Sequence, residues 1–131
     1  MHKGFIKTAA LLGALSVALG AFAAHALKQQ ISDYAVGIFE TGVRYQFYHV
    51  FALLAAGMLY KNFPNAFVRW SGIFFIAGII LFCGSLYALM YIKGAVMPGF
   101  KWVGAITPAG GFLFILGWIF LFIGLFKREI K

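Results

Sequence analysis

The chain has 131 residues, of which 63% are hydrophobic, 19% aromatic and only 11% charged. Because soluble domains carry about 25% charged residues, this composition excludes a water-soluble domain and indicates an integral membrane protein. Lys and Arg outnumber Asp and Glu by 11 to 3, but they stand singly or in short clusters at the ends of apolar runs, which is typical of membrane topology signals. We therefore expect no nucleic-acid partner.

Four segments are long and apolar enough to cross the hydrocarbon core as helices, which takes about 20 residues each. They are residues 5–27, 43–60, 70–92 and 108–126. The sequence thus predicts a single all-α domain over residues 1–131, folded as an integral membrane four-helix bundle.

The first of these spans also has features of a cleaved signal peptide. Lys3 and Lys7 precede its apolar run, and Ala21-Phe22-Ala23 is typical of a cleavage site. However, small residues recur every four positions, at Ser16, Gly20 and Ala24, and such a stripe lets another helix approach closely. A segment that is removed needs no such stripe, so we predict that the first span is retained.

The connections between the spans carry turn residues. Residues 28–42 place apolar side chains among polar neighbours, which predicts a short helix at the membrane surface, with a plain loop as the alternative. Pro98-Gly99 predicts a turn between the third and fourth spans. Thr107-Pro108 predicts the start of the last helix, because a hydroxyl residue caps a helix and proline is favoured at its first position.

The distribution of basic residues predicts the orientation of the bundle. With four spans, both termini lie on one side, which holds seven basic residues against four on the other side. The seven are Lys3, Lys7, Lys61, Arg69, Lys127, Arg128 and Lys131; the four are Lys28, Arg44, Lys93 and Lys101. The excess predicts cytoplasmic N- and C-termini in a bacterial inner membrane.

Small residues predict where the helices touch. Lipid tails are as apolar as leucine, so close packing and interhelical hydrogen bonds must hold the helices together. We expect helix contacts at Ser16, Gly20, Ala24, Gly84, Ser85, Gly110, Gly117 and Gly124. Trp118 is deep in its span and is expected to pack inside. The single cysteine, Cys83, excludes an intramolecular disulfide and a cysteine metal cluster.

The most polar part of any span is the stretch FETGVRYQFYHVFALL, residues 39–54. On a helix, two adjacent i, i+4 rows form one polar face: Glu40, Arg44 and Tyr48, and beside them Thr41, Tyr45 and His49. Glu40 precedes Arg44 in the order that favours an ion pair. His49 lies about 9 Å deeper than Val43 at 1.5 Å per residue, and we place His25 of the first span at a similar depth.

Polar groups inside a membrane are costly and indicate a functional site. The candidate cluster comprises His25, Glu40, Arg44, Tyr45, Gln46, Tyr48 and His49. Three interpretations stay open: a hydrogen-bonded network that fixes helix register, a binding site for a lipid headgroup, quinone or other small molecule near Arg44, and a haem or metal site at His25 and His49. The third lacks further ligands, so no metal and no cofactor is predicted.

Catalysis and transport have less support. No serine–histidine–acid set, carboxylate pair or phosphate-binding glycine loop is identified, so no catalytic residue is predicted. A proton-coupled transporter usually places an acid within a span, and the first, third and fourth spans contain none.

Four motifs carry a family resemblance: GAFAAHALK, ETGVRYQFYH, GSLYALM and ITPAGGFLFILGW. In this order they resemble the YgdD/YwdK-type family, small four-helix bacterial membrane proteins of unknown function. The resemblance covers nearly the whole chain and implies four helices and an integral membrane location. The positions that match its hallmarks are Gly20, His25, Glu40, Arg44, Tyr45, Gln46, His49, Gly84, Ser85, Thr107, Pro108, Gly110 and Gly111.

Together these observations predict a non-enzymatic membrane protein. Its expected partners are membrane lipid and either a larger membrane complex or further copies of the chain. The alternative is a protein that binds a small molecule or cofactor (quinone, haem or metal) at the polar cluster. A small transporter is the third hypothesis.

Overall fold

The computed structural model describes residues 1–94 and 102–126, and these ranges are almost entirely helical. The elements are α1 (Lys3–Ala24), the 3₁₀ turn η1 (Leu27–Gln29), α2 (Asp33–Leu59), α3 (Ala66–Gly78), the π-helical segment η2 (Ile79–Cys83), α4 (Gly84–Gly94) and α5 (Trp102–Gly124). Because α3, η2 and α4 follow one another without a break, they form one continuous helical rod, the central rod. The predicted all-α membrane bundle is confirmed.

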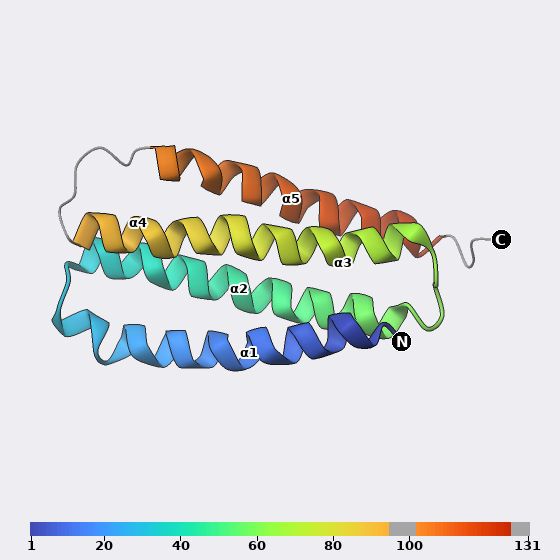
Figure 1. Ribbon diagram of the computed structural model, residues 1–131, viewed down its shortest axis with the longest axis horizontal. Coiled ribbons are helices and arrows are strands. Elements are labelled where there is room, and N and C mark those ends of the chain that lie inside the picture. Colours follow the sequence, from blue (N-terminus) through green and yellow to red (C-terminus); the bar gives the residue numbers. More distant parts are fainter. Residues whose placement is uncertain (95–101, 127–131) are drawn as a thin grey trace.

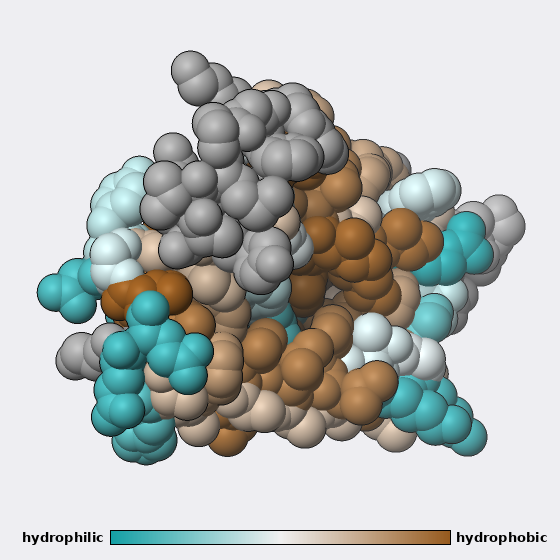
Figure 2. Space-filling view, turned by 60° about the vertical axis from the view of Figure 1, so that its left-hand side comes forward, coloured by the Kyte–Doolittle hydropathy of each residue, from teal (hydrophilic) through white to brown (hydrophobic). Residues whose placement is uncertain are grey.

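α1, α2, the central rod and α5 lie side by side in chain order, each antiparallel to the next (Figure 1). α1 packs on α2, α2 packs on the α3–η2–α4 rod, and α5 packs on that rod as well. The start of α1 and the end of α5 lie at the same end of the molecule. Figure 2 shows hydrophobic side chains over the middle of one face, with hydrophilic side chains gathered towards its two ends.

Three helices in the described ranges are long and apolar enough to cross a membrane: Lys3–Ala24, Ala66–Met90 and Val103–Gly124. α2 is equally long, but its polar side chains lower its hydropathy. It packs along both α1 and the central rod, so its axis is aligned with the axes of the three apolar helices. The crossing predicted for residues 43–60 stays a prediction.

The prediction for residues 28–42 is wrong in its details. Only Leu27–Gln29 forms a separate turn, and α2 begins at Asp33. The backbone N–H of Ala35 donates to the Ser32 hydroxyl at 3.2 Å, which caps the new helix. Val36 and Phe39 are buried, whereas Tyr34 is exposed, so one side of this stretch belongs to the bundle core and the stretch is no separate surface helix.

The predicted start of the last helix at Thr107-Pro108 is also wrong. α5 begins at Trp102 and Pro108 lies inside it. A proline within a membrane helix is tolerated where neighbouring helices and hydroxyl side chains satisfy the polar groups around it. Here the hydroxyls of Thr107 and Ser85 share a hydrogen bond that joins α5 to the central rod. The turn predicted at Pro98-Gly99 lies outside the described residues.

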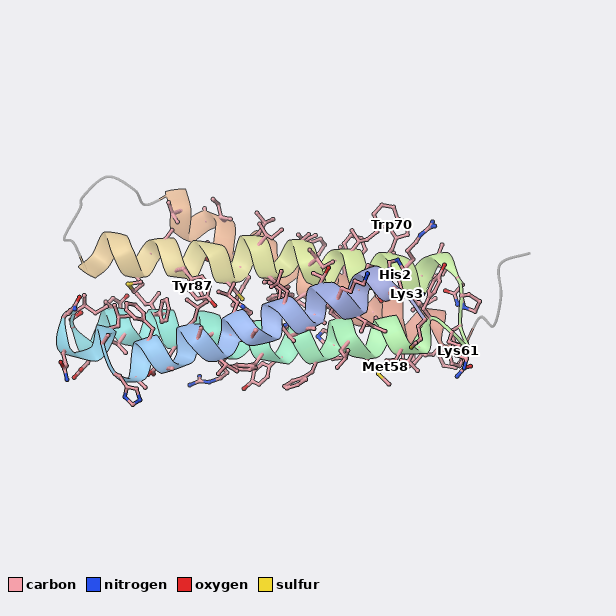
Figure 3. The ribbon with its side chains drawn as sticks, turned by 60° about the horizontal axis from the view of Figure 1, so that its bottom comes forward. His2, Lys3, Met58, Lys61, Trp70 and Tyr87 are labelled. Carbon is pink, nitrogen blue, oxygen red and sulfur yellow. The ribbon has the colours of Figure 1, made fainter. Side chains whose placement is uncertain are left out.

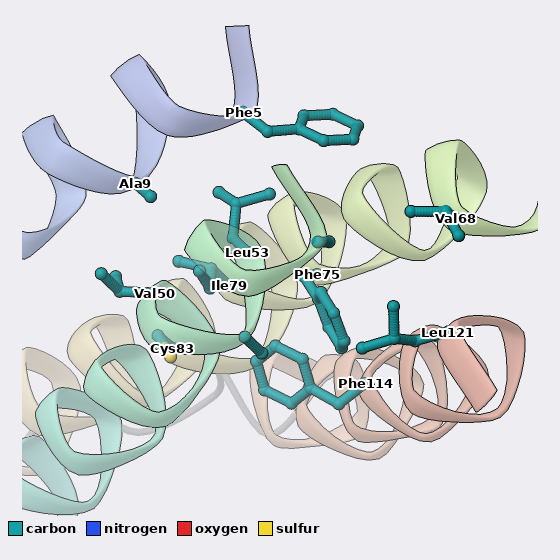
Figure 4. Close-up of a cluster of buried hydrophobic side chains, with 12 residues drawn as sticks. Phe5, Ala9, Val50, Leu53, Val68, Phe75, Ile79, Cys83, Phe114 and Leu121 are labelled. Carbon is teal, nitrogen blue, oxygen red and sulfur yellow. The ribbon is translucent and has the colours of Figure 1, made fainter. Parts of the chain in front are cut away.

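The core is built from aromatic rings that lie over glycines of the neighbouring helix. A Cβ placed on Gly117 would come within 2.6 Å of the Phe75 ring, and a Cβ on Gly78 would overlap the Phe114 ring. Figure 4 shows Phe75 of α3 and Phe114 of α5 meeting between their helices. Glycine thus lets α3 and α5 approach closely over much of their length.

The predicted contact residues divide into two groups. Most face a neighbouring helix, but Ala24 is exposed and a Cβ on Gly84 would meet nothing within 4 Å. Burial on α1 instead recurs every seven residues, at Ala9, Ser16 and Ala23, because nearly aligned helices contact every two turns. The residues that do face another helix are Ser16, Gly20, Ser85, Gly110, Gly117 and Gly124.

Candidate functional site

The predicted polar cluster is divided among three surroundings. Gln46 lies inside the bundle, His49 lies against α5, and the Glu40 and Arg44 side chains are exposed on the outer face of α2. Tyr45 and Tyr48 lie between the last two surroundings and are 38% and 51% exposed. The residues predicted to form one polar cluster therefore lie in different environments.

Gln46 is only 1% exposed and joins three helices. Its Nε2 donates to the carbonyl of Leu12 on α1 at 3.2 Å, and the Tyr87 hydroxyl of α4 donates to its Oε1 at 2.6 Å. Ser16 also donates to the Leu12 carbonyl, at 2.7 Å. Gly42 leaves space for the Tyr87 ring, which lies between α4 and the pair α1 and α2 in Figure 3. This network fixes helix register, as the first interpretation proposed for the whole cluster.

His49 is buried and both of its ring nitrogens are engaged. Trp118 donates its indole N–H to Nε2 at 3.1 Å, and Nδ1 lies 2.8 Å from the Tyr45 carbonyl oxygen. Because an indole N–H only donates, Nε2 is the acceptor and Nδ1 carries the proton, which it donates to the carbonyl. The imidazole also stacks on Phe114, with centroids 3.5 Å apart and planes 9° apart. In this arrangement neither nitrogen has a free lone pair for a metal.

His49 lies near the middle of the bundle along the helix axes. Phe114 is near the midpoint of the apolar segment Val103–Gly124, and Gly78 is the midpoint of Ala66–Met90. The Phe114 ring covers Gly78 and stacks on His49. If these segments are centred in a bilayer, His49 lies close to its midplane.

His25 lies far from this level. Gly13 of α1 faces Val50 of α2, and Gly20 faces Val43, so antiparallel pairing places His25 opposite residue 38. At 1.5 Å per residue, this is about 16 Å from the level of His49. The prediction of equal depth is wrong, and the structure does not bring the two histidines together. Within the described ranges, no group of three or more His, Cys, Asp or Glu side chains is arranged to hold a metal ion.

A groove of about 870 Å³ lies between α2 and α5, above η2. Its lining is apolar and mostly aromatic, and it consists of Tyr45, Tyr48, His49, Phe82, Pro108, Gly111, Phe112, Phe114, Ile115 and Trp118. Trp118 is 48% exposed and not packed inside as predicted, because its N–H reaches His49 while the ring lines the groove. Of the seven residues of the predicted polar cluster, only Tyr45, Tyr48 and His49 line it.

The α5 side of the groove had no polar signal in the sequence. Pro108, Gly111, Ile115 and Trp118 share one helix face by their spacing. In a helix that is apolar on every side, however, this spacing does not distinguish one face from another. Only the packing of α5 on the central rod determines which face is left open.

Glu40 and Arg44 do not pair with each other. Both side chains are exposed, and no ion pair joins them in the part of the chain that the structure describes. Arg44 precedes Tyr48 by one turn, and it lies about 8 Å from His49 along the helix axis. A guanidinium thus stands beside the groove at a depth that a centred bilayer would fill with hydrocarbon.

These features define a small helical membrane protein with an aromatic groove between α2 and α5. The family described as "Protein of unknown function (DUF423)" matches residues 19–111. A UPF0382 membrane protein of Staphylococcus aureus (strain bovine RF122 / ET3-1), SAB0533, is 44% identical over 95% of this chain and 97% of its own length. A UPF0382 membrane protein of Haemophilus influenzae is 42% identical over 98% of both chains.

The chain therefore belongs to this DUF423/UPF0382 family of membrane proteins of unknown function. The membrane location and the absence of an established activity agree with the resemblance found in the sequence, although these relatives carry the UPF0382 name and not the YgdD/YwdK name. No solved structure matches the chain.

Proposed function

We propose that the protein is a non-enzymatic protein of the bacterial inner membrane that binds a membrane lipid in the groove between α2 and α5. The observation that carries the proposal is the groove itself, which has the volume of a small-molecule site and an almost wholly apolar, aromatic lining. It opens sideways on the bundle, where lipid has direct access. Binding without reaction is favoured because the groove lining includes no acid and no nucleophile paired with a base.

The charges at the ends of the bundle support cytoplasmic termini. Lys3, Lys7, Lys61 and Arg69 are all exposed and belong to the end where α1 begins. Figure 3 shows His2, Lys3 and Lys61 at this end, with Trp70 nearby. Basic residues favour the cytoplasmic side of a membrane, and tryptophan favours its interface.

Native mass spectrometry from lipid nanodiscs tests the lipid-binding proposal. Gly111 lines the groove, so Gly111→Phe is expected to fill part of it and reduce the lipid molecules that stay bound to the released protein. Gly37→Phe is the matched control, because Gly37 is an exposed glycine of α2 with nothing within 4 Å of its Cβ position. Equal lipid retention by the wild type and both folded variants would contradict the proposal.

Arg44 favours a second candidate function, that of an accessory subunit in a membrane assembly. A lipid-facing charge is costly unless it is satisfied, and neither Glu40 nor Arg44 has an ion-pair partner among the described residues. A partner helix that carries opposite charges, or a second copy, would satisfy both. The same mass spectra distinguish this function, which predicts a discrete oligomer or hetero-complex instead of bound lipid.

A further inference from the structure

The groove contains hydrogen-bond donors that its own walls do not satisfy. Tyr45 and Tyr48 line it, and neither phenol hydroxyl has a hydrogen-bond partner within residues 1–94 and 102–126. By contrast, the deeper polar groups, His49 and Trp118, already satisfy each other. An unsatisfied hydroxyl in an apolar medium is costly, so two on one groove call for a ligand that accepts hydrogen bonds.

The depth of these hydroxyls restricts the class of ligand. Tyr45 and Tyr48 lie within about 6 Å of His49 along the helix axis. A hydrocarbon core extends about 15 Å from its midplane, so both tyrosines lie well inside it. Phospholipid phosphates lie outside that core and do not reach this depth. The acceptor must belong to a neutral molecule that dissolves in the bilayer interior.

The shape and chemistry of the lining restrict the class further. Tyr45 lies 4.8 Å from Phe82 and 5.6 Å from Tyr48, centroid to centroid, so the wall that carries the two tyrosines is built of aromatic rings. Their faces favour a flat ring. The neighbouring Arg44 adds N–H donors and no acceptor. A planar molecule with carbonyl acceptors and an apolar tail is complementary to this set.

We propose that the lipid bound in this groove is an isoprenoid quinone, with its ring in the groove against Tyr45 and Tyr48 and its carbonyl oxygens accepting hydrogen bonds from their hydroxyls. The tail then follows the apolar side of the groove along α5, past Phe112 and Ile115. This inference rests on the proposed lipid-binding function and names the class of lipid. It involves binding alone and no transfer of electrons.

Trp118 provides a reporter for the test. The chain contains three tryptophans, so Trp70→Phe with Trp102→Phe leaves Trp118, in the groove, as the only one. The full-length protein in nanodiscs is titrated with decyl-1,4-benzoquinone, and quenching is expressed against mole fraction in the bilayer. Saturable quenching of Trp118 is expected. A variant that retains only Trp70, which lies near the start of α3 and does not line the groove, is expected to show unsaturable quenching alone.

Tyr45→Phe and Tyr48→Phe remove one hydroxyl each and keep the ring. Each is expected to weaken quinone binding about two- to tenfold, the range for one lost hydrogen bond. Tyr34→Phe is the matched control, because Tyr34 is an exposed tyrosine of the same helix that does not line the groove, and it should leave the affinity unchanged.

Decylbenzene, which lacks the carbonyls, separates this inference from the proposed function, because it competes for an apolar groove without accepting hydrogen bonds. Competition at the same mole fraction as the quinone, with no effect of the two tyrosine variants, would overturn the quinone assignment and leave the lipid groove standing. Unsaturable quenching of Trp118 with no competition by any additive, together with equal lipid retention by Gly111→Phe, would overturn both.

Discussion

Gln46 shows how a single polar residue can fix the register of three helices. Substituting Leu for Gln46 removes the partner of the Tyr87 hydroxyl and one donor to the Leu12 carbonyl, while both groups stay at a helix junction. We expect Gln46→Leu to lower the free energy of unfolding by about 1–2 kcal/mol, because it leaves the Tyr87 hydroxyl without its hydrogen-bond partner. The cost of an unpaired buried group exceeds the net contribution of an interhelical hydrogen bond in a membrane protein. Unfolding in mixed detergent micelles measures the loss.

The control for this prediction is the double variant. Tyr87→Phe removes the hydroxyl that Gln46→Leu leaves unpaired, so the two losses together should be smaller than the sum of the separate losses. Strictly additive losses would show that the Gln46–Tyr87 hydrogen bond makes no contribution.

At the same scale, the sequence identified the polar residues but not their separate roles. Gln46 and His49 are three residues apart, and the sequence predicted both as members of one polar cluster. Their environments differ because α1 and α4 cover the first, whereas α5 covers the second. The partner of His49 lies 69 residues away in the chain, and no local pattern encodes it.

Individual glycines differ in what they contribute to the contacts between helices. A Cβ on Gly117 would lie within 2.6 Å of the Phe75 ring, whereas a Cβ on Gly84 would meet nothing within 4 Å. Gly117→Ala is therefore expected to destabilise the protein by about 1–3 kcal/mol through overpacking. Gly84→Ala is expected to be neutral or to stabilise by up to about 1 kcal/mol, because alanine favours a helix.

Thermal unfolding of the two variants in the same detergent checks this difference, and equal shifts in Tm would contradict it. The sequence predicted both glycines as contacts with equal weight. Composition and spacing identify small residues, but only the rotation of each helix against its neighbour determines which of them are covered. Composition likewise made the all-α class predictable. The continuation of α5 through Pro108 was not predictable, because it depends on contacts with the neighbouring helix.

The crossing of α2 determines the topology of the whole molecule. If α2 spans the bilayer between α1 and the central rod, then the turn near Gln30 and the loop near Asn62 face opposite sides of the membrane. The basic residues Lys3, Lys61 and Arg69 predict that the Asn62 side is cytoplasmic. Hydropathy alone does not establish the crossing, because the polar residues that make α2 functionally interesting also lower its apolar character.

Cysteine labelling tests this topology directly. Cys83 is the single cysteine and is buried, so Cys83→Ala provides a background for one new thiol at a time. Gln30 and Asn62 are both exposed. In intact spheroplasts, a membrane-impermeant maleimide should label Gln30→Cys at once and Asn62→Cys only after the membrane is opened. Labelling of both from outside would place α2 on the membrane surface, and the groove would then no longer face hydrocarbon. The reverse pattern would keep four spans but place the termini outside.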